Sequence, residues 1–385
     1  MRIVCLLRVL VLGLMSALCH SQSLVLLAKA ALPAATLLRV AANAAAATSW
    51  CPAGAAAWPG LLLPAGAPGE SGAVFALLAG PLAASERECV LQPAAAAAGT
   101  EWRCASVGTE RELRFGDKLF LRTATGFDPA QLEASFKSFQ HLFAADTATQ
   151  LTKGAGGKHS HHRGLFLGWN QATIDGRTFD FWHGKEGVSI RHKRFRDDLA
   201  AAGAACVRLG VENEWCLADG TPVVQELRVL TAFRCGAARA LDVQIGLRAL
   251  GQPVSMRGDA HHAGLHVRAA DEVAEREADT QLLLDAAHKP LGNDLHSGAA
   301  WCAASFKVGQ QPCTFLLIDH PSNGSTVMSV RTYGRIGFMP EVDLVPDQTR
   351  VLRWRLLVFD GAAPDAATCA QLAELYRNPP VLTWR

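Results

Sequence analysis

The chain has 385 residues, of which 50% are hydrophobic and 19% charged, and its formal net charge is +2. This near balance, without a stripe of basic and aromatic residues, argues against nucleic acid as a partner. The length exceeds that of one typical hydrophobic core and predicts two domains.

Residues 1–21 have the layout of a secretory signal peptide. Arg2 and Arg8 accompany an apolar run over residues 9–18, and small residues follow it. The run is shorter than the roughly 20 apolar residues of a membrane helix, so an uncleaved anchor is the weaker alternative. A lipid attached at Cys19 is a further alternative, which the bulky Leu18 disfavours. We therefore expect a periplasmic or extracellular protein with no membrane contact beyond export.

The cysteines fit an exported chain without a zinc ribbon. Removal of Cys5 and Cys19 with the signal segment leaves nine of the 11, so at least one thiol stays unpaired while some disulfides are expected. No Cys-x-x-Cys pair is present, and a thioredoxin-like motif is therefore absent as well.

Residues 24–108 predict a small N-terminal β domain. Short apolar runs such as 61–63 and 74–78 stand between Gly and Pro, although the high Ala content leaves helix as an alternative. We place a domain boundary at Thr109, because charged residues become frequent there, and assign residues 109–385 to a second domain. Asp128 and Pro129 could cap a helix toward Leu142, with an extended segment as the alternative.

The rest of the second domain has the two-residue periodicity of strands. Residues 207–217 and 223–233 form the clearest hairpin, because Asp219-Gly220 suits the tight turn between them. Further strands are predicted at 241–250, 264–270, 300–308, 314–318, 327–332 and 351–359, and one helix at 365–376. The predicted fold is all-β: an antiparallel β-sandwich or a large curved double sheet, with a small N-terminal β domain and a short C-terminal helix.

Histidines mark the region where function is expected. All of the 13 except His20 lie between His141 and His320, and the richest stretch is residues 153–192. If residues 158–162 are extended, His159 and His161 project to one face and can bind a divalent metal such as zinc, copper or iron. The predicted metal set is His159, His161 and His183, with His192, Asp180 or Glu226 as alternative third ligands.

The alternative is that the same residues form an acid–base site without a metal ion. His161 would transfer a proton, with His183 or His266 as its partner, while Arg163 or Lys153 holds an oxyanion or a carboxylate. His266 and Arg268 share one strand face by the two-residue rule. The other predicted catalytic residues are Arg268, His320 and Arg331, and the predicted substrate-binding residues are Lys153, Trp169, Asn170, Asp180, Trp182, Glu226 and Tyr333. The two tryptophans offer flat faces to sugar rings, although tryptophan in a β protein more often packs in the core. For the others, the alternative is core hydrogen bonding, turn chemistry or surface charge.

Several motifs follow one another in order along the second domain: Lys153-Gly-Ala-Gly-Gly, His161-His-Arg-Gly-Leu-Phe-Leu-Gly-Trp-Asn170, Asp180-Phe-Trp-His183, His262-Ala-Gly-Leu-His-Val-Arg268, Asp319-His-Pro-Ser-Asn323 and Arg331-Thr-Tyr-Gly334. Together they resemble the PmoA-like domain family of secreted bacterial proteins, whose label refers to methane oxygenase. The resemblance covers residues 110–361, and the stretch before it resembles the small β domain that often precedes this module. It implies a β-sandwich related to sugar-processing double sheets and a part in carbohydrate breakdown, and it assigns no catalytic residue.

Three functions remain open at this point. The first is an exported enzyme that acts on a carbohydrate or sugar derivative, of lyase, hydrolase or epimerase type, by histidine acid–base chemistry. The second is a metal-dependent oxidoreductase or hydrolase, and the third is a sugar-binding module without catalysis. In each case the partner is a small molecule or an oligosaccharide.

Overall fold

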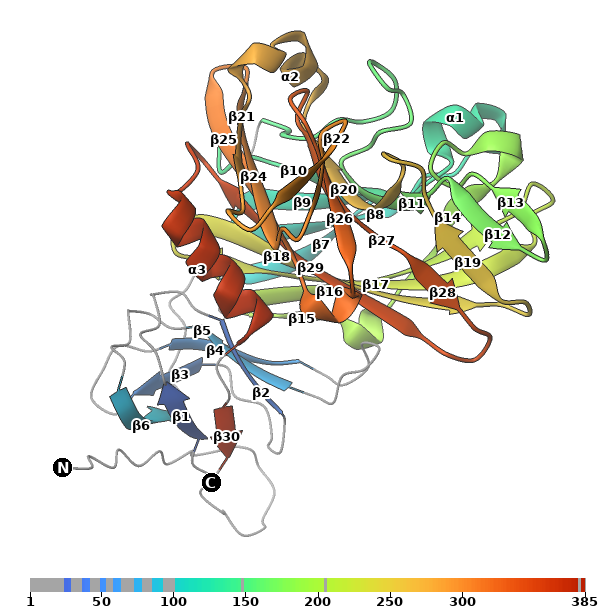
Figure 1. Cartoon of the computed structure of the whole chain (residues 1–385). Helices are drawn as coiled ribbons and strands as arrows, with labels where there is room; N and C mark the ends of the chain where they lie inside the picture. The colour runs from blue at the N-terminus through green and yellow to red at the C-terminus, as the bar shows by residue number, and fades with distance from the viewer. Residues whose placement is uncertain are drawn as a thin grey trace, which may run out of the picture.

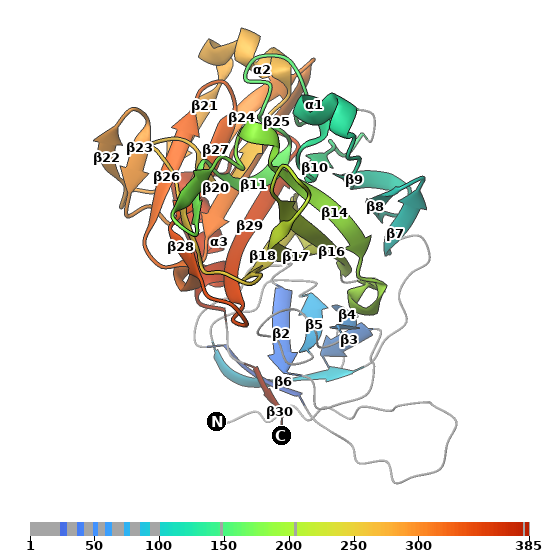
Figure 2. The same cartoon turned by 90° about the vertical axis from the view of Figure 1, so that its right-hand side faces the viewer.

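The computed structural model describes residues 101–146, 149–203 and 206–379, and between 24 and 92 and at 382–384 it describes strand backbone only. The predicted signal peptide lies outside these residues. Antiparallel sheets dominate the fold, as predicted (Figures 1 and 2). No helix in the described part of the chain is long and apolar enough to cross a membrane.

A ten-stranded sheet carries the region of interest. Its strands, in spatial order, are β22 (Lys289–Gly292), β23 (Leu295–Ser297), β26 (Thr326–Arg331), β27 (Arg335–Pro340), β20 (Ala263–Arg268), β11 (Leu165–Trp169), β10 (Phe139–Leu142), β9 (Lys118–Ala124), β8 (Glu110–Phe115) and β7 (Trp102–Val107). Because β7 pairs with β8, the sheet begins before the boundary predicted at Thr109.

A nine-stranded sheet packs against the first. Its strands, in spatial order, are β14 (Ser189–Phe195), β16 (Cys206–Cys216), β17 (Pro222–Cys235), β18 (Ala238–Ala249), β29 (Arg350–Phe359), β25 (Gln311–Asp319), β24 (Trp301–Val308) and β21 (Gln281–Leu284), with β15 (Ala201–Ala202) beside β16. The predicted hairpin is β16–β17, whose register pairs Leu209 with Leu230.

The remaining strands form two smaller sheets. The four-stranded sheet has the order β13 (Arg177–Phe179), β12 (Gln171–Ile174), β19 (Val254–Arg257) and β28 (Val342–Leu344). The seven-stranded sheet has the order β2 (Leu37–Ala41), β5 (Ala73–Leu77), β4 (Trp58–Leu63), β3 (Ser49–Pro52), β6 (Ser85–Gln92), β1 (Leu24–Ala28) and β30 (Leu382–Trp384). Its last strand comes from the C-terminal end of the chain, within the range 109–385 assigned to the second domain.

The hydrophobic core lies between the two large sheets. Alternation along β11 points Leu165, Leu167 and Trp169 into this core, and β16 supplies Leu209 and Val211 from the other side. The opposite face of the ten-stranded sheet therefore carries the alternate residues of its strands. On β11 and β20 these include Phe166 and His266, which lie opposite each other in the register.

Helices are short and lie outside the sheets. They are α1 (Leu132–Ser135), α2 (Asp271–Glu275) and α3 (Ala366–Arg377), with one-turn 3₁₀ helices η1 (Pro129–Gln131), η2 (Lys185–Gly187), η3 (Asp197–Leu199), η4 (Glu277–Asp279) and η5 (Pro321–Asn323). The predicted C-terminal helix is α3, and the Asp365 side chain caps it by accepting from the backbone N–H of Thr368 at 2.7 Å. The helix predicted after Asp128 is confined to η1 and α1, since the chain extends into β10 from Phe139.

The cysteines of the described residues form no disulfides. Cys104, Cys206, Cys216, Cys235, Cys302, Cys313 and Cys369 are all free thiols. Burial raises the pKa of Cys206 to about 12, so this thiol packs as a small apolar group. The disulfides expected for an exported chain are therefore not found among these seven.

Candidate metal centre

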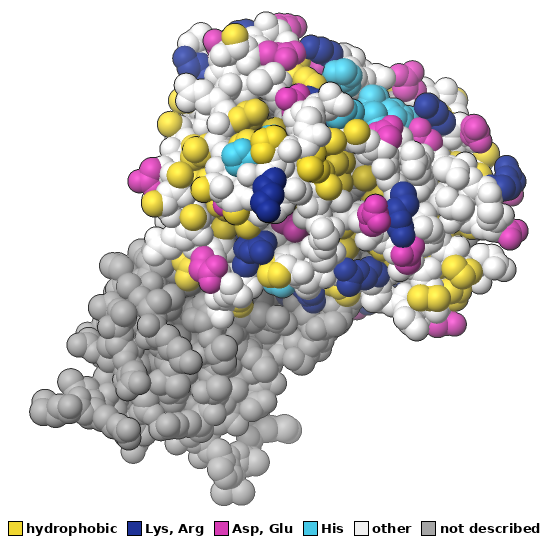
Figure 3. Space-filling model, viewed as in Figure 1, with side chains coloured by type: hydrophobic (Ala, Val, Ile, Leu, Met, Phe, Trp, Pro, Cys, Tyr) yellow, Lys and Arg dark blue, Asp and Glu magenta, His cyan; other side chains and the backbone are white. Residues whose placement is uncertain are grey.

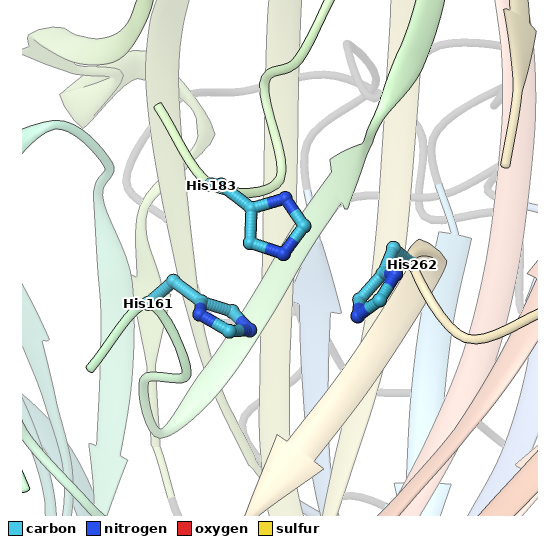
Figure 4. Close-up of side chains that lie close together, drawn as sticks. All are labelled: His161, His183 and His262. Carbon is cyan, nitrogen blue, oxygen red and sulfur yellow. The ribbon is translucent and has the colours of Figure 1, made fainter. Parts of the chain in front are cut away.

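Three histidines from separate loops meet beside the ten-stranded sheet. His161 precedes β11, His183 follows β13, and His262 precedes β20. Each offers one ligand atom, and these atoms lie within 4.8 Å of one another. Figure 4 shows the three rings turned toward a common centre. Among the residues that the structure describes, this is the one group of His, Cys, Asp or Glu side chains with such spacing.

Asp180 sets the orientation of His183. Its Oδ2 accepts from Nδ1 of His183 at 2.8 Å, and its Oδ1 accepts from the backbone N–H groups of Trp182 at 3.1 Å and His183 at 2.9 Å. A proton held on Nδ1 leaves the lone pair on Nε2 of His183. Burial alone would raise the pKa of Asp180, but the hydrogen bonds from His183 outweigh it and lower that pKa.

Asp259 sets the orientation of His262 in the same way. Its Oδ1 accepts from Nδ1 of His262 at 2.7 Å and from the backbone N–H of His261 at 2.9 Å. Asn170 holds this carboxylate in place, because its Nδ2 donates to Oδ2 of Asp259 at 2.7 Å and its Oδ1 accepts from the Asp259 N–H at 3.0 Å. Nε2 of His262 is thereby left as the ligand atom.

His161 stands on a tight turn braced by Arg163. The backbone N–H of His162 donates to the carbonyl of His159 at 2.9 Å, so residues 159–162 form a turn instead of the extended segment predicted. The Arg163 guanidinium is fully buried and donates to the carbonyls of Ser160 and Glu133. It is thus committed to backbone groups, which corrects its predicted role in holding substrate.

The ligand set differs from the predicted one in a single histidine. His161 lies 4.3 Å from His183 between ring centroids, and His183 lies 4.7 Å from His262. His159 has a positive φ of 57° and turns its ring toward Tyr333, at 4.9 Å. The turn therefore removes His159 from the centre, and His262 takes its place.

Buried rings form the floor of the centre. Trp182 and His266 are fully buried with ring centroids 4.9 Å apart, and His162 lies 4.3 Å from His161. Gly168 allows the Trp182 loop to approach β11, because a Cβ there would meet the Trp182 backbone at 3.3 Å. Within the described residues, the Trp182 indole nitrogen and Nδ1 of His266 are buried without a hydrogen-bond partner.

The electrostatics favour neutral imidazoles. Burial, followed by the charges of His183 and Lys137, lowers the pKa of His161 to about 2. Burial and Arg335 hold the pKa values of His162 and His266 well below their ordinary range. Neutral imidazole is the form that coordinates a metal ion.

Basic and aromatic side chains lie close together on the strands and loops around the centre. Nη2 of Arg331 lies 2.8 Å from Nδ1 of His261, while Nη1 of Arg331 pairs with Asp294 at 2.5 Å. The Arg268 guanidinium lies 4.9 Å from the ring centroid of Tyr333. Arg268 and His266 share one face of β20, as predicted, but both are fully buried there.

Several predicted site residues lie elsewhere or in the interior. Trp169 is fully buried, donates to the carbonyl of Pro340 at 3.0 Å and packs in the core, so it offers no face to a sugar. Glu226 accepts from Asn213 and Trp215 at 2.9 Å inside the nine-stranded sheet. Lys153 is buried with its ammonium 3.3 Å from Asp271.

Two further histidines stand apart from the centre. His320 follows β25 and bonds Ser322 at 2.8 Å, beside Tyr376 on α3. His192 lies on β14 with its ring 4.4 Å from Phe195. Neither contacts the three-histidine group.

The sequence reasoning missed His262 and Asp259 as members of the centre. Both carboxylate–histidine pairs share the spacing Asp-x-x-His, in Asp180-Phe-Trp-His183 and Asp259-Ala-His-His262. This repeat lets the Asp side chain accept a backbone N–H and a ring N–H together. It is a sequence signal that links the two loops, although Asp285-Ala-Ala-His288 has the same spacing and bonds its ring to the Asp285 carbonyl.

Figure 3 shows a group of histidine side chains at the molecular surface, with acidic and basic side chains around it. The side chains of His183 and His262 are 19% and 25% exposed. The centre is therefore reached by solvent while its floor is dry.

Comparisons with known proteins give one family and distant structural neighbours. Residues 110–374 match a family described as "Family of unknown function (DUF6807)". A search among curated proteins finds no match. The fold is similar to the GH36 α-galactosidase AgaB from Geobacillus stearothermophilus, at 11% identity and a TM-score of 0.34, over 69% of this chain and 40% of that one.

A second structural neighbour is a protein in glycosyl hydrolase family 38 from Enterococcus faecalis. It is 10% identical with a TM-score of 0.42, over 94% of this chain and 47% of that one. This chain thus spans less than half of either structure. The matched family description contains no reference to PmoA, so that resemblance stays a prediction.

Proposed function

This chain belongs to the DUF6807 family, whose function is unknown, and we propose that it is a metal-dependent enzyme whose ion is held by His161, His183 and His262. The observation that carries this proposal is the convergence of three imidazoles, two of which are oriented by carboxylates on their Nδ1. Such carboxylate–histidine pairs are the usual outer partners of metal-binding histidines.

The donor set fits a divalent ion of the zinc, copper or iron type. Imidazole nitrogens suit these ions, whereas magnesium and calcium prefer oxygen ligands. In a tetrahedral zinc site with bonds of about 2.0–2.1 Å, the ligand nitrogens lie roughly 3.4 Å apart. The ligand atoms of the three histidines now lie within 4.8 Å of one another, and side-chain movements of about 1 Å would bring them to that spacing.

Three protein ligands at a solvent-reached position support catalysis over a purely structural role. Structural zinc sites are normally closed by four protein ligands, whereas catalytic sites keep one position for water or substrate. A bound ion would supply Lewis acidity and a more acidic water. The chain's own residues fix the ligand tautomers through Asp180 and Asp259, and they keep water from the rear of the centre through Trp182 and His266.

For the substrate we propose a carbohydrate or sugar derivative, handled outside the cytoplasm. The export proposal is supported by the basic and apolar pattern of residues 1–21. Hydrolysis is the reaction class that requires least beyond the residues present, because a metal-activated water needs no redox partner. Acid–base chemistry by His161 without a metal is the second candidate, and its support is the position of His161, which is half-buried with its ring 4.3 Å from that of His183.

The proposal is tested by the metal content of protein purified without an affinity tag. We expect one zinc, copper or iron ion per chain by inductively coupled plasma mass spectrometry, and less than a tenth of that for His161→Ala, His183→Ala and His262→Ala. His159→Ala is the matched control, because His159 is an exposed histidine two positions from His161 and should keep the ion. Metal-free wild-type protein that also takes up no ion on titration would overturn the proposal.

A further inference from the structure

A pocket of about 440 Å³ lies next to the loop that carries His262. Asp259 and Ala263 line it from that loop and the start of β20, and Leu295, Val327 and Met339 line it from β23, β26 and β27. The volume lies within the roughly 300–1,000 Å³ typical of small-molecule sites.

The strand register places this pocket on the same sheet face as the histidine floor. His266 pairs with Gly337, Gly337 with Ser329, and Ser329 with Leu295, so these residues form one row across four strands. Val327 and Met339 pair with each other one row further and, by two-residue alternation, point to the same side. The pocket and the metal centre thus lie side by side on the outer face of the ten-stranded sheet.

Asp259 is part of both the metal centre and the pocket. Its carboxylate orients His262 at 2.7 Å, and it also forms part of the pocket wall. A molecule in the pocket therefore contacts the residue that positions a metal ligand. In Figure 3, hydrophobic side chains gather over the β22–β27 part of the sheet, next to the histidines.

The side chains that line the pocket indicate which kind of molecule it can bind. Leu295, Val327 and Met339 present an aliphatic surface, while Ser325, Asp259 and Glu341 supply a hydroxyl and two carboxylates. No Lys or Arg is among the described residues that line the pocket, and Arg257 approaches it only through its pair with Glu341 at 3.3 Å. Carboxylates accept hydrogen bonds from hydroxyl groups and repel anions.

We propose that this pocket is a subsite for one neutral sugar ring of an oligosaccharide, whose neighbouring unit lies at the metal centre. The ring's C–H face packs on the aliphatic side chains, and its hydroxyls donate to Asp259 and Glu341. This inference rests on the proposed function, since it names the substrate class of the same site as neutral and oligomeric. Sugars whose acidic group would enter the pocket are excluded from this subsite.

The test uses the full chain and a panel of neutral gluco-, galacto-, manno- and xylo-oligosaccharides with uronate oligosaccharides beside them. After a glycan array identifies a ligand, isothermal titration calorimetry compares wild type with Ser325→Trp, which fills the pocket from an exposed position. Leu291→Asp is a second variant, because Leu291 lines the pocket and is 56% exposed. Gln310→Trp, at the exposed β24–β25 turn, is the control.

We expect a neutral oligosaccharide to bind, with at least tenfold weaker affinity in both pocket variants and unchanged affinity in Gln310→Trp. Exclusive binding of uronates, binding of no glycan, or equal affinity in all variants would overturn the subsite. Metal content measured on the same samples separates the two proposals. Wild-type protein that carries a full metal site but binds no neutral glycan refutes the subsite alone, whereas wild-type protein without metal refutes the proposed function.

Discussion

Replacement of Asp180 by Asn tests whether the carboxylates tune the metal ligands. Both oxygens of Asp180 accept: Oδ1 from two backbone N–H groups and Oδ2 from Nδ1 of His183. An amide has one oxygen, so its NH₂ group must face a donor. If the backbone bonds are kept, His183 must move its proton to Nε2, the nitrogen that binds the ion.

The corresponding change at Asp259 is milder. There Oδ1 alone accepts from His261 and from the His262 ring, while Oδ2 faces Asn170. The amide oxygen can keep both bonds at Oδ1, and only the contact with Asn170 is lost. The Asp259 side chain is also 44% exposed, against 14% for Asp180, so water replaces part of the loss.

Loss of an outer partner typically weakens metal binding by about 10–100-fold, or roughly 1.4–2.7 kcal/mol. We therefore expect Asp180→Asn to weaken zinc binding by close to 100-fold and Asp259→Asn to weaken it by close to tenfold. Zinc affinity is measured on tag-free apoprotein by competition with a chromophoric chelator. Asp343→Asn is the control, since it removes a surface carboxylate paired with Arg257 away from the histidines.

Two results would refute this reasoning. One is an affinity for Asp180→Asn within twofold of the control. The other is a larger loss for Asp259→Asn than for Asp180→Asn, because the difference between the two follows directly from their hydrogen-bond patterns. Circular dichroism on each variant confirms that the fold is kept.

Three further predictions concern the support of the site and the stability of the fold. Gly337→Ala should lower the free energy of unfolding by about 1–3 kcal/mol in chemical denaturation, because its Cβ would overlap the His266 ring; an unchanged midpoint contradicts this. Trp169→Phe should lower the free energy of unfolding by about 1–3 kcal/mol, because the hydrogen bond to the Pro340 carbonyl is lost, while zinc affinity stays within twofold of wild type. Loss of glycan binding without loss of stability would instead support the predicted contact between Trp169 and a sugar ring. Burial raises the pKa of Asp319 to about 6, against hydrogen bonds from Asn323 that lower it, so the protonated acid stabilises the folded state. The stabilisation by the protonated acid is complete below the unfolded pKa near 4 and is lost as pH rises to about 6, which lowers the free energy of unfolding by roughly 3 kcal/mol. The free energy of unfolding of Asp319→Asn should therefore change less between pH 4 and 6 than that of wild type. Parallel profiles for the two proteins would disprove the assignment.

Features that depend on neighbouring residues were predictable from the sequence. The hairpin β16–β17 follows from alternation on both sides of Asp219-Gly220, whose glycine has a φ of 87°. Asp365 caps α3 through a bond to a residue three positions away. In each case the interacting groups lie within a few residues, so composition and spacing carry the information.

The sequence also located two of the three histidines of the candidate centre, since His161 and His183 both lie in the stretch chosen for its histidines. It could not select the third ligand. His262 reaches His161 because β20 pairs with β11, about a hundred residues apart in the chain, and a strand pattern does not reveal its partner. The turn that removes His159 depends on the buried guanidinium of Arg163 reaching Glu133, another distant contact.

The sequence by itself determined the class of the fold, its clearest hairpin and capped helix, and the enrichment of imidazoles in one region, because these properties are set by local alternation, turn chemistry and residue type. Only the tertiary structure decided which histidines converge, that Asp180 and Asp259 act alike, and that Trp169 and Glu226 are interior residues. Those outcomes depend on which strands pair and which faces pack, and the free energy of such long-range contacts belongs to pairs of segments and cannot be read from either segment alone.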